Sequence, residues 1–108
     1  MTRIELPQGT LDLLVLRVLS AGEMHGWGVA QRLSIVSRDA LQLQEGTIYP
    51  ALYRMEAKGW IDSEWAISEN NRRAKYYRLT KVGRMQLEAQ KEGWARLTAV
   101  VAQVMQKA

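Results

Sequence analysis

The sequence lacks cysteine and phenylalanine entirely, and its 108 residues include two prolines and one histidine. Without cysteine, a disulfide framework, a thiolate nucleophile and a cysteine-ligated zinc or iron–sulfur site are all excluded. The single histidine, His25, has no second histidine one helical turn away, so it does not support a metal site. We therefore expect no metal, no cofactor and no catalytic residues.

Long apolar runs are also missing. Uninterrupted stretches such as Leu13–Leu16 are short, whereas a helix that spans a bilayer needs about 20 apolar residues. Residues 1–7 contain no apolar core of the kind found in signal peptides. We expect a soluble, cytoplasmic protein with no membrane partner.

The length predicts one domain, and the net charge of +4 is unevenly distributed. Between Arg72 and Arg84 there are six cations and no acid. Such a segment favours a polyanionic partner, because each phosphate that it neutralises releases counterions. The alternative is a basic face that meets only solvent.

Apolar periodicity predicts three helices before residue 60. The first spans about residues 10–21, with Thr10 as its N-cap and Gly22 after its end. It is apolar on nearly all sides, so it is either central to the core or shared with a second subunit. The second spans residues 26–36 and has a weak first turn, because two glycines lie in it.

The third helix is predicted to begin near residues 46–47 and to end at Gly59, with Pro50 in its first turn, where a missing N–H costs little. Its core side carries Ile48, Leu52 and Met55 at helical spacing. The exposed side then carries two tyrosines, one turn apart and next to an arginine. The alternative is that one tyrosine packs into the core.

Two strand-like runs follow, over residues 60–67 and 75–79. Asn70 and Asn71 tolerate positive φ and are predicted at the turn. We expect Trp60 and Trp65 to pack within this hairpin and against the core. The result is a hairpin with a basic tip and a basic returning strand.

A last helix of about 26 residues is predicted from Thr80, its N-cap, to near Met105. It carries a seam with alternating spacings of four and three, made of Gly83, Leu87, Gln90, Trp94, Leu97, Val101, Val104 and Ala108. A domain of this size has little core left to cover such a helix. The seam therefore predicts a partner helix from a second copy of the chain.

The predicted fold is mainly α with a small β-hairpin: a winged helix-turn-helix plus a C-terminal dimerisation helix. Residues 1–80 form the DNA-binding domain, and residues 81–108 form the dimerisation helix, packed on the first helix in one compact unit. In this arrangement the third helix enters the major groove of double-stranded DNA, and the hairpin is the wing that contacts the flanking backbone.

Three segments resemble the PadR family of bacterial transcription regulators. Residues 24–33 resemble its second-helix signature, residues 45–56 its recognition-helix signature E-G-x-[LI]-Y-P-x-L-x-R-[LM]-E, and residues 72–84 the returning strand of its wing. The resemblance covers about residues 8–105, and the single C-terminal helix is similar to the short subgroup. Trp27 departs from the usual tyrosine. The resemblance implies a homodimeric repressor on an inverted repeat, released in some members by an effector.

The candidate DNA contacts are Thr47, Tyr49, Pro50, Tyr53, Arg54, Lys58, Arg72, Arg73 and Lys75. Thr47 and its neighbouring amides lie at a helix start, where a phosphate binds well, although simple capping is the alternative. Arg54 can form two hydrogen bonds to guanine, or else pair with a nearby acid. The tyrosines are expected on phosphates, and the wing cations on phosphate or the minor groove.

The candidate seam for dimerisation or for an effector is Trp94, Leu97, Val101 and Val104. In some short family members a tryptophan on this helix stacks planar drugs, so the resemblance implies a planar small-molecule effector here. The alternative is that Trp94 belongs to the dimer core. For the whole chain the alternative function is a winged-helix protein-interaction module that reads no DNA sequence.

Overall fold

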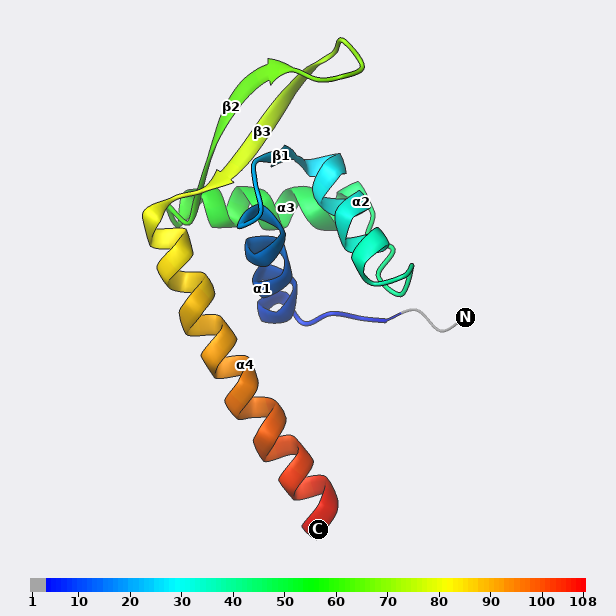
Figure 1. Cartoon of the computed structure of the whole chain (residues 1–108), viewed down its shortest axis with the longest axis vertical. Helices are drawn as coiled ribbons and strands as arrows, with labels where there is room; N and C mark the ends of the chain where they lie inside the picture. Colours follow the sequence, from blue (N-terminus) through cyan, green and yellow to red (C-terminus); the bar gives the residue numbers. More distant parts are fainter. Residues whose placement is uncertain (1–3) are drawn as a thin grey trace.

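The computed structural model describes residues 4–108, which form four helices and a three-stranded antiparallel sheet (Figure 1). The elements follow the chain in the order α1 (Gln8–Leu19), β1 (Met24–His25), α2 (Gly26–Val36), α3 (Glu45–Ala57), β2 (Ile61–Ile67), β3 (Arg73–Leu79) and α4 (Lys81–Lys107). The strand order is β1-β3-β2. The predicted fold class, a mainly α winged helix-turn-helix with a C-terminal helix, is confirmed.

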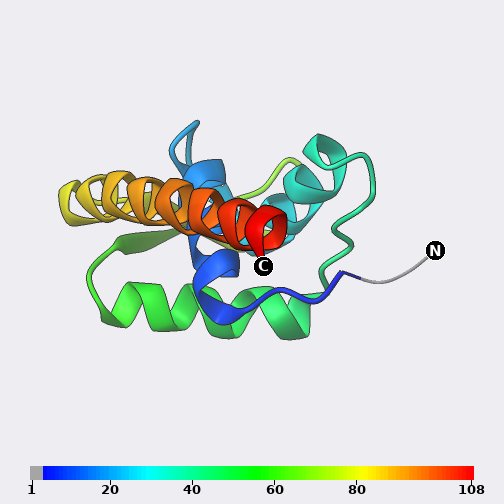
Figure 2. The ribbon, with the colours of Figure 1, turned by 90° about the horizontal axis from the view of Figure 1, so that it is seen from below.

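The core is built around α1, which lies between α3 and α4 (Figure 2). Val15 and Leu16 of α1 are fully buried. The face predicted for α3 is confirmed, since Ile48, Leu52 and Met55 are fully buried as well. The apolar surface on nearly all sides of α1 therefore serves a central position in the subunit's own core.

Two local predictions about helix starts are wrong. Thr10 is not the N-cap of α1, because the helix begins at Gln8 and the Leu11 amide donates to the Pro7 carbonyl at 3.0 Å. Pro7 has the fixed φ that suits a helix start. Pro50 is not in the first turn of α3, because that helix begins at Glu45. The proline therefore removes one interior hydrogen bond from the ladder.

The start of α4 is fixed on the turn that follows α3. The Thr80 hydroxyl accepts from the Gly83 amide at 3.0 Å, which confirms the predicted N-cap, and it donates to the Gly59 carbonyl at 2.6 Å. A Cβ on Gly83 would lie 1.9 Å from the Trp60 carbonyl oxygen. The glycine thus allows α4 to approach the hairpin closely.

Only the first part of α4 contributes to this core. Gly83 and Leu87 are buried, whereas Trp94, Leu97 and Val101 are about half exposed. The molecule measures 55 × 35 × 20 Å, and the tip of the hairpin and the C-terminus lie at the two ends of its longest axis (Figure 1). The second half of α4 therefore projects from the subunit with an uncovered apolar stripe.

Candidate nucleic-acid interface

The third helix is held against the second through Tyr49. Its ring fills the space above Gly26, where a Cβ would lie 2.6 Å from the tyrosine Cε1. Burial, and next the charge of Glu45, raise the pKa of Tyr49. Tyr49 thus serves the packing of α2 on α3, which is the alternative expected for one of the two tyrosines.

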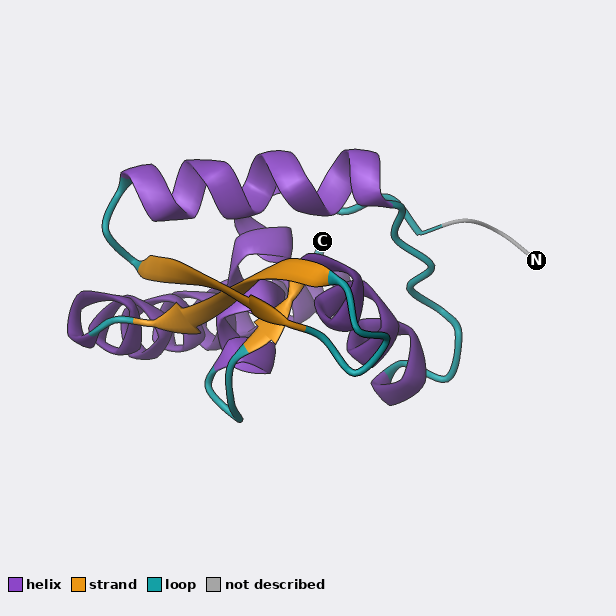
Figure 3. Ribbon diagram, turned by 90° about the horizontal axis from the view of Figure 1, so that it is seen from above, coloured by secondary structure: helices purple, strands orange, loops and turns teal. Residues whose placement is uncertain are grey.

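Tyr53 is the exposed member of the pair. Its ring centroid lies 6.1 Å from that of Tyr49, and 55% of the residue is exposed. The Lys75 ammonium lies 5.8 Å from the centre of the Tyr53 ring. The exposed side of α3 and the returning strand of the hairpin therefore meet at Tyr53 and Lys75. Figure 3 shows the hairpin as a whole running alongside α3.

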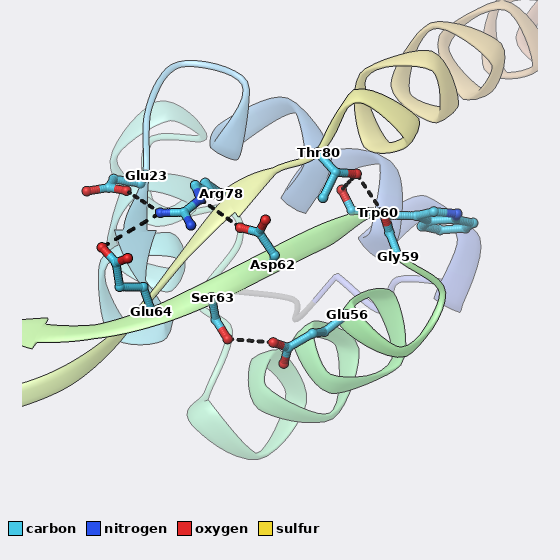
Figure 4. A network of polar contacts seen from close by, with 9 residues as sticks. All are labelled: Glu23, Glu56, Gly59, Trp60, Asp62, Ser63, Glu64, Arg78 and Thr80. Carbon is cyan, nitrogen blue, oxygen red and sulfur yellow. Dashed lines mark hydrogen bonds and ion pairs between the residues drawn. The ribbon is translucent and has the colours of Figure 1, made fainter.

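Glu56 holds the hairpin against α3. One carboxylate oxygen accepts from the Ser63 hydroxyl on β2 at 2.5 Å (Figure 4). The other carboxylate oxygen lies 3.3 Å from the Lys75 ammonium on β3. Both strands are thus tied to one side chain of α3. This clamp, Glu56 with Ser63 and Lys75, fixes the angle between the helix and the wing.

Arg54 faces the opposite way, toward the core. Its guanidinium pairs with Asp12 on α1, a carboxylate of which 4% is exposed. This is the pairing with a nearby acid that the sequence left open as the alternative to base recognition. A buried carboxylate needs such a partner, because an unpaired buried charge is very costly.

The other candidate residues of α3 lie at its two ends. Thr47 is exposed, but its amide donates to the Gln44 carbonyl at 2.9 Å, so the hydroxyl and not this amide is free for a phosphate. Pro50 is exposed in the second turn. Lys58 follows the last turn, with its ammonium 4.6 Å from the centre of the Trp60 ring.

The tip of the wing has the predicted turn. Asn71 has φ of 59°, and the Ser68 amide donates to the Arg72 carbonyl at 2.7 Å. Arg72 and Arg73 are both exposed on the returning side. Trp65 does not pack into the core as predicted, because 55% of the residue is exposed and it is absent from the buried core.

The two faces of the hairpin differ in charge. On the face away from α3, Arg78 lies 2.7 Å from Asp62 and 3.8 Å from Glu64, and Glu23 approaches the same guanidinium at 3.7 Å (Figure 4). Arg78 is therefore neutralised by carboxylates of this subunit. Arg72 and Arg73, at the tip, form no ion pair with the residues that the structure describes, whereas Lys75 on the side of α3 is paired with Glu56.

The seam residues lie apart from this surface. Trp94 and Leu97 line a groove of about 720 Å³ between α4 and the segment around Leu6, Pro7 and Leu13. Val101 and Val104 continue the stripe beyond the groove and are about half exposed. Among residues 4–108, no helix has the length and apolar character of a membrane span, and no three ligand-type side chains gather to hold a metal ion.

Three residues that shape this region, Asp12, Glu56 and Trp65, are not among the predicted site residues. Glu56 and Asp12 act through partners that are distant in sequence, Lys75 and Arg54 respectively. The sequence predicts packing for Trp65, since a tryptophan in a strand fits a buried position as well as an exposed one. The alternation of β2 offered a signal, because Trp65 shares its face with Ser63 and not with the acids.

Known proteins share this architecture. The transcriptional regulator PadR-like family matches residues 15–89. A transcriptional regulator of Mycobacterium tuberculosis is 34% identical over 83 residues, which are 77% of this chain and 74% of the relative.

Among solved structures, a PadR family regulator from Clostridium difficile has a TM-score of 0.75 at 34% identity, over 88% of this chain and 97% of that one. A PadR-like regulator from Bacillus cereus has a TM-score of 0.78 at 29% identity, over 94% and 96% of the two chains. These relatives are regulators and not enzymes. The chain belongs to the PadR-like family of transcriptional regulators.

Proposed function

We propose that this protein is a homodimeric repressor that binds an inverted-repeat operator through α3 and the hairpin and works in the cytoplasm. The observation that carries the proposal is the common surface of these elements, where Lys75 of β3 lies 5.8 Å from the ring of the exposed Tyr53 on α3 and Arg73 is exposed farther along the same strand. Cations beside an exposed helix suit the phosphates that flank a major groove.

Within this proposal the candidate residues divide into contacts and supports. Arg54 and Tyr49 hold α3 in place from the protein side, through Asp12 and Gly26 respectively. The proposed DNA contacts are Thr47, Pro50, Tyr53, Lys58, Arg72, Arg73 and Lys75. Lys75 must leave or share the Glu56 carboxylate when it meets a phosphate.

The proposed dimer forms through the projecting half of α4, by the seam Trp94, Leu97, Val101 and Val104. These side chains are about half exposed in the single subunit, and an apolar stripe on a helix is stabilised by packing against a second helix. A two-fold pair of subunits presents two copies of α3, which read half-sites about 34 Å apart. Residues 81–108 act as the dimerisation helix and residues 1–80 as the DNA-binding domain.

The groove beside Trp94 is the proposed effector site. A planar small molecule stacked there would lie between α4 and the segment that precedes α1. A ligand that favours a different angle between the two α4 helices changes the separation of the two α3 helices, and DNA is then released. A planar cation that binds the dimer without changing its affinity for DNA contradicts this step.

Fluorescence anisotropy tests the function directly. The full chain is titrated onto the fragment upstream of its own gene and onto a scrambled duplex of equal length, at several salt concentrations. We expect tight, salt-dependent binding with preference for the native fragment. An absence of binding to both duplexes at low salt contradicts the proposal and favours the protein-interaction module.

A further inference from the structure

The exposed tryptophan of the wing lies on a defined face of the hairpin. Successive side chains of a strand alternate between its two faces. Ser63 contacts Glu56 of α3, so Trp65 and Ile67 of β2 share the face that is turned toward α3. In the register of the hairpin, Trp65 is opposite Lys75 and Ile67 is opposite Arg73.

The helix α3 does not cover this indole. Trp65 is 55% exposed, and the Arg73 guanidinium carbon lies 4.8 Å from the centre of its ring. Trp65 is absent from the buried core, so the fold gains little from its size. A large aromatic ring that is half exposed and stacked with an arginine offers an apolar and cationic surface to a partner.

The charges around Trp65 indicate which partner fits. On its own face Arg73 is stacked on the ring, and Lys75 is opposite it in register and paired with Glu56. Asp62 and Glu64 of the same strand point to the opposite face with Arg78. An aromatic ring among cations is suited to a nucleic-acid backbone, where sugars are apolar and phosphates are anionic. The surface also continues directly into the proposed contact surface of α3.

We infer that Trp65 is itself a DNA contact, which packs its indole against the deoxyribose groups at the edge of the minor groove beside the half-site. Arg73, already stacked on the ring, neutralises the adjacent phosphate. The indole supplies the apolar part of the contact and Arg73 supplies the ionic part. Because the two side chains are already stacked on each other, they lose little conformational freedom when DNA binds. This inference rests on the proposed function.

The test compares Trp65→Ala, Trp65→Phe and Arg73→Gln with the unaltered chain by anisotropy across salt. For Trp65→Ala we expect affinity to fall about tenfold with an unchanged salt slope, because no ionic contact is removed. Arg73→Gln is expected to lower the slope by about 1, the value of one phosphate contact. Trp65→Phe retains part of the affinity.

The matched control is the double variant Trp65→Ala/Ala66→Trp. It keeps the composition and moves the indole by one residue, to the opposite face of the exposed strand. We expect it to bind as weakly as Trp65→Ala. If it restores full affinity, a general apolar effect operates and the inference is wrong. Circular dichroism melts of all variants verify that the fold is kept.

The outcomes separate this inference from the proposed function. If the unaltered chain binds no duplex, the proposed function has failed. If it binds and Trp65→Ala binds equally well, the inference alone has failed. If Trp65→Ala instead lowers the salt slope as much as Arg73→Gln and weakens binding no further, Trp65 merely positions Arg73, which also overturns a direct contact. Capture of a protein by the wing with unchanged DNA binding in Trp65→Ala contradicts it as well.

Discussion

The hairpin and the second half of α4 both project from the helical core, and they present opposite chemistry. The exposed side chains of the hairpin tip are mainly polar or charged, with Arg72, Arg73 and Glu69 beside Trp65 and Ile67. Those of the second half of α4 are mainly apolar, including Leu97, Val101 and Val104. An identical copy cannot cover a cationic surface, because like charges repel, but it can cover an apolar stripe across a two-fold axis. The hairpin therefore requires a partner of different chemistry, while the helix is complementary to itself.

The largest expected effect breaks the self-complementary element. Leu97→Glu/Val101→Glu places four carboxylates on one seam of the proposed dimer, so we expect a folded monomer in sedimentation equilibrium. Affinity for an inverted repeat should fall by about 100-fold or more, because the second half-site no longer binds from the same particle. Met85→Glu, an exposed apolar position off the seam, is the control. A double variant that stays dimeric contradicts the seam.

The second effect concerns α3, the element that lies between the two projections. Arg54→Ala leaves the buried Asp12 carboxylate unpaired, so we expect a loss of about 2–3 kcal/mol in urea unfolding, below the value for fully buried pairs because Arg54 is partly exposed.

Asp12→Ala/Arg54→Ala is the matched control and should recover part of the loss, since no charge then remains buried. Stability that is unchanged in Arg54→Ala, together with altered base preference, would instead assign Arg54 to base recognition.

The third effect tests the hairpin as the ionic element. Arg72→Ala/Arg73→Ala should lower the slope of log affinity against log salt by about 2 and weaken binding to every duplex by a similar factor, about tenfold near physiological salt. Arg96→Ala removes an exposed cation from the other projection and should leave the slope unchanged. If Arg96→Ala changes the salt slope as much as the hairpin variant does, the hairpin is not the ionic element and the contrast between the hairpin and α4 is wrong.

The fourth effect is smaller and sharpens the role of the clamp. Glu56→Gln frees Lys75 from its carboxylate, so we expect binding to scrambled DNA to strengthen about threefold while the preference for the native fragment declines. Glu69→Gln removes the same charge from the hairpin loop without touching the clamp, and it controls for charge alone. If both variants behave alike in anisotropy, the geometry of the clamp has no effect.

Much of the fold that underlies this comparison could be predicted from residues that interact with near neighbours in the sequence. The i, i+4, i+7 spacing of Ile48, Leu52 and Met55 fixed the buried face of α3, and the Thr80 cap and the turn at Asn71 follow from short-range chemistry. Such signals lie within a few residues of one another. They were sufficient for the helices and the hairpin, whereas the seam stays a prediction.

The parts that were not predicted depend on distant partners. Arg54 and Asp12 are 42 residues apart, and a sequence does not reveal which acid a helix side chain will meet. The strand β1 has two residues, too few for any periodicity, and it exists through its pairing with Tyr76 and Tyr77. The exposure of Trp65 depends on where α3 ends beneath the hairpin, which is a property of packing.

The smallest expected effect lies at the base of the hairpin, where Tyr77 is buried and its hydroxyl has no hydrogen-bond partner among the described residues. Burial, and then Tyr53 and Glu56, raise the pKa of Tyr77 to about 12. The pKa of Tyr77 in the folded protein therefore exceeds the value of about 10 in the unfolded chain. The contribution of this tyrosine to the free energy of unfolding is fully present below pH 10 and is lost as the pH rises toward 12.

Tyr77→Phe should change unfolding at neutral pH by less than about 1 kcal/mol, since a hydroxyl without a partner contributes little. It should also remove the last component of the tyrosinate absorbance titration and part of the alkaline decline in stability. If Tyr77→Phe lowers the free energy of unfolding by several kcal/mol at neutral pH, the hydroxyl binds a structural water at the base of the hairpin. The buried base of the hairpin would then contain a hydrated polar group, and Tyr77 would stabilise the fold through its hydroxyl as well as through its ring.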